Sequence, residues 1–93
     1  MSEEVELEGA SERERLFFAA KTGRLKEFQE LLRSSKVRLN VADGLGNTPL
    51  HYAAAGDHGA LAIFMLKTDK KIINLPNSVG DTPLHKVIYF STL

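Results

Sequence analysis

The sequence predicts an all-α solenoid built from helix–turn–helix units, and three observations lead to this fold class. The tetrapeptide Thr-Pro-Leu-His occurs at residues 48–51 and again, 34 positions later, at residues 82–85. An Ala-Ala pair recurs with the same offset, at residues 19–20 and 53–54. Between these copies, apolar residues recur at the spacing of a helix face. Self-similarity with a period in the low thirties is typical of a repeat solenoid.

The first helix is expected to begin at a capping box. The Ser11 hydroxyl can accept a hydrogen bond from the first turn, and the Glu14 side chain can reach back to the backbone N–H of Ser11. The helix should run to about Thr22, because Gly23 is a suitable left-handed terminator. Residues 1–10 are polar and acidic without a sustained period, so we expect a disordered acidic leader there.

The second helix is expected over about residues 25–34, where apolar residues form one stripe and polar residues lie outside it. The expected buried faces of the two helices are Leu16, Ala19 and Ala20 in the first and Leu25, Phe28, Leu31 and Leu32 in the second.

The next unit opens with a turn-rich connection over residues 35–47. Thr48 should then cap a helix whose first position is Pro49, where the missing N–H costs nothing. The Ala-Ala pair at residues 53–54 should let neighbouring helices approach closely.

These residues resemble the ankyrin repeat. Residues 46–54 (Gly-Asn-Thr-Pro-Leu-His-Tyr-Ala-Ala) reproduce the first half of the family pattern, and Asn74 closes the unit. The resemblance covers roughly residues 12–90. It implies a left-handed residue at Asp57, where the family has Gly, and Asp tolerates that conformation better than most residues. It implies helix–turn–helix units with hairpin-like fingers and a protein-binding function, usually without catalysis. The expected domain spans residues 11–93, with repeats at about residues 11–45 and 46–79 and an incomplete third repeat at residues 80–93.

The resemblance also implies where a protein partner would bind a scaffold or adaptor of this kind. In ankyrin arrays the fingers and the first-helix faces line a concave groove. Phe18 and Tyr52 are 34 residues apart, so we expect them to stack as neighbouring aromatic residues on that side. Leu45 and Val79 are apolar residues at finger tips. The candidate partner-binding residues are Phe18, Leu45, Asn47, Tyr52, Ala55, Val79, Asp81 and Lys86.

The third repeat suggests an alternative role. It stops at Leu93, and residues 87–90 are apolar or aromatic with no second helix after them. A solenoid normally ends in a polar capping repeat. We therefore expect either a fragment of a longer array or self-association through residues 86–93, which would make the chain a structural, self-assembling element.

Nucleic-acid binding is a lesser alternative. Formal net charge is zero, although residues 1–14 carry six Glu and one Arg, which leaves the remainder mildly basic. Basic residues recur at equivalent places in two linkers, and a solvated edge is the favoured interpretation of them. They are Lys36 and Arg38 in the first linker and Lys67, Lys70 and Lys71 in the second.

No catalytic, cofactor or metal site is expected. The repeat motif accounts for His51 and His85, which we expect to be structural, and His58 has no evident catalytic partner beyond the adjacent Asp57. The chain has no cysteine, no secretory signal and no apolar run of the ~18 residues that a membrane span needs. We therefore expect an intracellular protein, cytoplasmic or nuclear.

Overall fold

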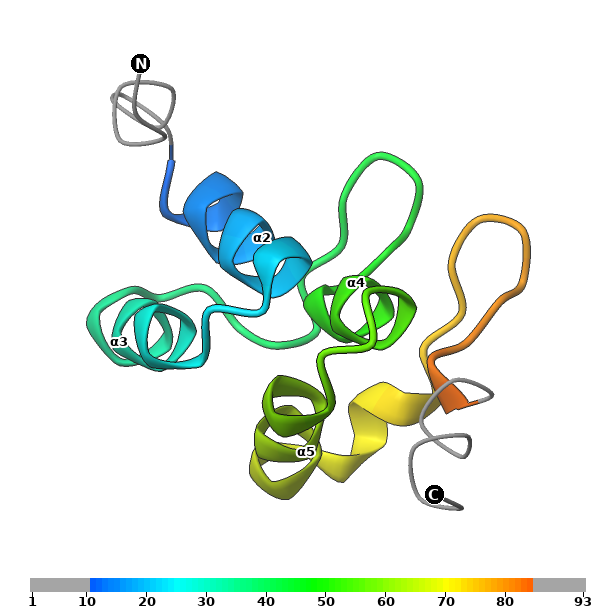
Figure 1. The fold of residues 1–93 in the computed structure, drawn as a ribbon. Coiled ribbons are helices and arrows are strands. Elements are labelled where there is room, and N and C mark those ends of the chain that lie inside the picture. The colour runs from blue at the N-terminus through cyan, green and yellow to red at the C-terminus, as the bar shows by residue number, and fades with distance from the viewer. Residues whose placement is uncertain (1–10, 85–93) are drawn as a thin grey trace.

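The computed structural model describes residues 11–84, which form two helix–turn–helix units followed by a short 3-10 helix. Helices α2 (Glu12–Thr22) and α3 (Leu25–Ser34) form the first unit. Helices α4 (Pro49–Ala55) and α5 (Gly59–Thr68) form the second, and η1 (Lys70–Asn74) follows it. Figure 1 shows the two units side by side, with α2 next to α4. No strand occurs in this range, so the described part agrees with the all-α prediction.

The residues at the helix ends adopt the conformations that the sequence predicts. Ser11 and Glu14 form the reciprocal capping box, and Gly23 ends α2 in the left-handed region with φ of 72°. Thr48 caps α4 and Pro49 occupies its first turn. Asp57 has φ of 64°, so it takes the left-handed position that the repeat requires. The boundaries of these helices are thus fixed by local chemistry.

The core lies between the two units and is made largely of small and aliphatic side chains. The predicted buried face of α2 is confirmed, since Leu16, Ala19 and Ala20 are all 0% exposed. In α3 only Phe28 is fully buried, whereas Leu25, Leu31 and Leu32 are half-buried against the core. The remaining core residues are Leu39, Leu50, Ala53, Leu61, Ala62, Met65 and Ile72.

Two loops project from the same side of the helices, one before α4 and one after η1 (Figure 1). Their turns lie at residues 43–47, here named finger 1, and at residues 77–81, here named finger 2. The expected leader at residues 1–10 and the C-terminal residues 85–93 lie outside the described part.

Candidate protein-binding surface

Finger 1 is closed by the side chain of Asp43. Its Oδ1 accepts hydrogen bonds from the backbone N–H groups of Leu45 and Asn47, at 2.9 and 3.0 Å. The backbone N–H of Gly46 donates to the carbonyl oxygen of Asp43 at 2.9 Å. One short carboxylate therefore satisfies the N–H groups of Leu45 and Asn47, as Asp side chains do in tight turns.

Finger 2 repeats this arrangement with Asn77 in place of Asp43. Asn77 Oδ1 accepts from the N–H groups of Val79 and Asp81, at 3.1 and 2.9 Å. The N–H of Gly80 donates to the Asn77 carbonyl oxygen at 3.0 Å. An amide oxygen thus does in finger 2 what a carboxylate oxygen does in finger 1, which leaves the Asn77 NH₂ group free for another partner.

That partner is finger 1. Asn77 Nδ2 donates to Asn47 Oδ1 at 2.8 Å, and the backbone N–H of Ser78 donates to the Leu45 carbonyl oxygen at 2.9 Å. The backbones approach closely at Gly46, where φ is 78° and a Cβ atom would lie 2.8 Å from the nitrogen of Ser78. The two fingers therefore form one tied pair.

Tyr52 of α4 is hydrogen-bonded to finger 1. Its hydroxyl donates to Asp43 Oδ2, and Asn47 Nδ2 donates to the same hydroxyl at 3.4 Å. Burial acts to raise the pKa of Asp43, but hydrogen bonds from Tyr52, Asn47 and Leu45 outweigh it and hold that pKa below its ordinary value. The hydrogen bond to Asp43 raises the pKa of Tyr52. At neutral pH the pair is therefore a carboxylate and a neutral phenol.

The aromatic neighbour of Tyr52 is Phe17, so the expected stacking with Phe18 is wrong. The Phe17 and Tyr52 rings meet edge to face with centroids 5.8 Å apart. Phe18 instead lies under the Arg24 guanidinium, 5.6 Å from its ring centroid. Side chains at equivalent positions point in similar directions from helices whose axes lie about 8–10 Å apart, so they do not face each other. Phe17, one position earlier, instead faces Tyr52. Pairing by the repeat offset alone missed this geometry.

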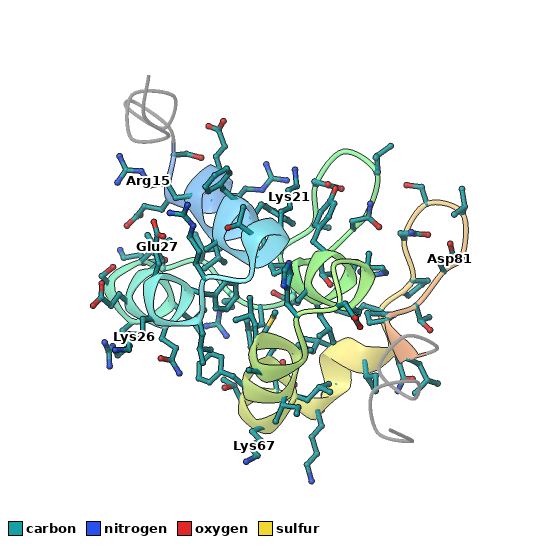
Figure 2. The ribbon with its side chains drawn as sticks, viewed as in Figure 1. Arg15, Lys21, Lys26, Glu27, Lys67 and Asp81 are labelled. Atoms are coloured by element: carbon teal, nitrogen blue, oxygen red, sulfur yellow. The ribbon has the colours of Figure 1, made fainter. Side chains whose placement is uncertain are left out.

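Lys21 completes the cluster around Tyr52. Its ammonium group lies 4.7 Å from the centroid of the Tyr52 ring, and Figure 2 shows it between α2 and finger 1. Its charge also contributes to the lowered pKa of Asp43. The Tyr52 ring is therefore held by an edge-to-face contact with Phe17, by Lys21 over its face and by Asp43 at its hydroxyl.

One histidine joins α4 to finger 2, and another joins the second unit to the first. Thr48 N–H donates to His51 Nδ1 at 3.0 Å, so Nε2 carries the proton that the Asp81 carbonyl oxygen accepts at 2.9 Å. This confirms the structural role expected of His51, whereas His85 lies outside the described residues. His58 was not singled out as structural, yet its Nε2 lies 2.9 Å from the Lys21 carbonyl oxygen at the end of α2.

Four of the candidate partner-binding residues line one hollow of about 260 Å³ between α4 and finger 2. They are Asn47, Tyr52, Ala55 and Asp81, and the other lining residues are His51, Asn77, Thr82 and Pro83. A second hollow of about 330 Å³, between α2 and finger 1, contains Phe18. Leu45 and Val79 are 65% and 81% exposed at the finger tips. Lys86, and with it the expected self-association through residues 86–93, lies outside the described part.

The α5 side of the molecule, here named the outer face, lies away from the two fingers (Figure 1). Ile63 of α5 is 51% exposed there, beside Leu66, Lys67 and Lys70. Within residues 11–84 no three His, Asp or Glu side chains gather as metal ligands. None of the described helices is long and apolar enough to cross a membrane.

Comparison with known proteins agrees with the geometry. A family model described as ankyrin repeats, in three copies, matches residues 16–92. Alpha-latrotoxin-Lhe1a from Latrodectus hesperus is 44% identical over 50 residues, which are 54% of this chain and only 4% of that protein. The chain therefore spans a small part of the length of this relative. Because the family model covers most of the chain and the helices agree with it, the predicted fold is confirmed and the chain belongs to the ankyrin repeat family, a non-enzymatic interaction fold.

Proposed function

We propose that this chain is a scaffold or adaptor module that binds a protein partner through the hollow beside α4 and the tips of both fingers. Ankyrin repeats are generally protein–protein interaction modules. The observation that carries the finer proposal is the pair of large apolar side chains, Leu45 and Val79, held in solvent on the same tied pair of fingers.

The finger tips offer binding energy that the folded chain does not use. Fully burying a Leu or Val side chain stabilises a complex by roughly 1.5–3 kcal/mol. The two side chains stand on turns that are already fixed by hydrogen bonds within and between the fingers. A partner would therefore spend little free energy on ordering this surface.

The hollow beside α4 forms the second part of the proposed binding surface. Tyr52 presents a large ring that is restrained on three sides, and aromatic residues of this kind often dominate binding energy. Ala55 is exposed next to it, and its small side chain leaves the hollow open. The hydrogen bonds and ring contacts of Tyr52 make it unsuitable as a test position, because its removal would also weaken finger 1.

The test uses the finger tips instead. A tagged chain with Leu45→Ser and Val79→Ser should lose bound proteins from cell lysate by about tenfold or more, since 1.4 kcal/mol corresponds to a factor of ten. The matched control is Ile63→Ser, which removes a comparably exposed apolar side chain from the outer face. Quantitative mass spectrometry measures the captured proteins, and circular dichroism verifies that all variants are folded.

A second variant separates the hollow from the tips. Ala55→Gln fills the space above α4 without a change of charge and should reduce capture of the same proteins. The proposal is contradicted if the tip variant retains every protein that the wild-type chain captures. It is also contradicted if Ile63→Ser loses the same proteins, or if the chain recovers only copies of itself.

A further inference from the structure

The tied pair of fingers shows how one finger covers the edge of the next. Finger 1 presents an acceptor edge, made of the Leu45 carbonyl oxygen and Asn47 Oδ1. Finger 2 presents a donor edge to it, made of the Ser78 N–H and the Asn77 NH₂ group. Each edge thus has one backbone group and one side-chain group.

Finger 2 has an acceptor edge of its own, displaced by the 34-residue repeat. It consists of the Val79 carbonyl oxygen and the Asp81 carboxylate, which correspond to Leu45 and Asn47. Among the described residues, no group donates a hydrogen bond to either one. Gly80 has no described atom within 4 Å of its ideal Cβ position, whereas Gly46 faces the finger 2 backbone. Figure 2 shows Asp81 on this finger.

The acceptor edge of finger 2 differs in charge from the acceptor edge of finger 1. Where finger 1 offers an amide oxygen, finger 2 offers a carboxylate that needs a hydrogen-bond donor, neutral or cationic. We propose that the acceptor edge of finger 2 is an interaction edge for a finger-type turn that donates a backbone N–H to Val79 and a side-chain N–H to Asp81, and that it rejects finger 1 of a second copy of this chain.

The rejection follows from the donor edge of finger 1. Gly44 is the equivalent of Ser78, and among the described residues its N–H has no acceptor, so it could serve the Val79 carbonyl oxygen of another copy. Asp43 is the equivalent of Asn77, but it brings a carboxylate in place of the NH₂ group. In this register, carboxylates of Asp43 and Asp81 would meet where Asn77 and Asn47 hydrogen-bond at 2.8 Å. Like charges so placed oppose association strongly.

The experiment removes one carboxylate at a time and measures self-association by sedimentation velocity over a range of concentrations. Asp81→Asn gives this edge the amide of finger 1, whose NH₂ group can donate to Asp43 of a second copy. Asp43→Asn gives finger 1 the donor of finger 2, which the native Asp81 carboxylate can accept. Each variant should self-associate at a concentration about tenfold or more below that needed by the wild-type chain, because the like-charge pair is gone.

Two further variants make the outcome specific. Asp57→Asn removes the same charge from an exposed turn away from the fingers, and should behave as the wild type. Gly44→Pro, added to Asp81→Asn, should return the chain to wild-type behaviour. Pro is favoured at the second position of the Asp43–Gly46 turn but has no N–H to donate.

The proposal is overturned if the wild-type chain self-associates as strongly as the two single variants. It is equally overturned if Asp57→Asn matches Asp81→Asn, or if Gly44→Pro has no effect. Should Asp43→Asn fail to fold by circular dichroism, the comparison of Asp81→Asn with and without Gly44→Pro decides the outcome alone.

Discussion

The contact between the fingers predicts that two equivalent glycines respond differently to the same substitution. Gly46 and Gly80 are 34 residues apart and have φ of 78° and 87°. An Ala at either position suffers the left-handed conformation, at about 1–2 kcal/mol, offset by about 0.4–1 kcal/mol from the less flexible unfolded chain. These contributions are shared, so they cancel when the two variants are compared.

Only the Gly46 position adds a steric conflict. Its Cβ would lie 2.8 Å from the nitrogen of Ser78 and 3.1 Å from the Cα of Asn77, and both of these are backbone atoms that cannot turn away. Finger 2 must then shift, which breaks the hydrogen bond from Ser78 to Leu45 and the one from Asn77 to Asn47. At about 1 kcal/mol for each bond, Gly46→Ala should be about 2 kcal/mol less stable than Gly80→Ala.

Urea unfolding followed by circular dichroism measures this difference, provided that both variants keep the same m-value. Equal losses of unfolding free energy in the two variants would refute the reasoning, because the fingers would then not be in contact in solution. A larger loss at Gly80 would contradict it as well, since no described atom crowds that position.

Four further predictions concern Tyr52, Asp43 and Asp57. Tyr52→Phe keeps the ring but leaves the Asp43 carboxylate without its hydroxyl partner. The free energy of unfolding, measured in urea, should therefore fall by about 1.5–3 kcal/mol. The fall should be smaller when the same substitution is made in the Asp43→Asn variant. The pKa of Asp43 lies below its ordinary value of 3.8, so the stability that this carboxylate contributes should be complete above pH 3.8 and lost as the pH falls through the lowered pKa. Asp43→Asn should flatten the acid limb of a plot of unfolding free energy against pH. The raised pKa of Tyr52 predicts a contribution that is complete below pH 10.0 and lost as the pH rises through the raised value, which Tyr52→Phe should abolish. Asp57→Gly should raise the midpoint of thermal unfolding. The backbone strain that Gly relieves at φ of 64° exceeds the entropic cost of a more flexible unfolded chain by about 0.5 kcal/mol.

The helix ends could be predicted because they depend on neighbours in sequence. Ser11 and Glu14 are three residues apart, and their reciprocal hydrogen bonds need no information from the rest of the fold. Thr48 with Pro49 is equally local. Even Asp57, which departs from the usual residue type, could be placed in the left-handed region from the repeat register alone.

The contacts between units could not be predicted in the same way. The 34-residue offset says which positions are equivalent, but contacts join positions that are not equivalent, such as Phe17 with Tyr52. Asn77 reaches Asn47, which is the equivalent of Asp81 and not of Asn77. Such pairs depend on the distance and rotation between neighbouring units, which no single-residue pattern encodes. The equivalence of Asp43 and Asn77 was nevertheless readable from the sequence, and it is the signal that would have found the tie between the fingers.

The Asp and Asn residues occur in opposite order along the two fingers. Finger 1 begins with Asp43 and ends with Asn47, whereas finger 2 begins with Asn77 and ends with Asp81. The neutral amides therefore face each other at the contact, where one donates to the other at 2.8 Å. The carboxylates fall at the two outer edges of the pair. An Asp at position 77 would place a carboxylate against the Asn47 amide oxygen unless that amide turned, whereas an Asp at position 47 could still accept from the Asn77 NH₂ group. The same two residue types thus favour the contact within the chain and oppose the corresponding contact between copies. The residues at positions 43, 47, 77 and 81 therefore allow the fold while they disfavour self-association.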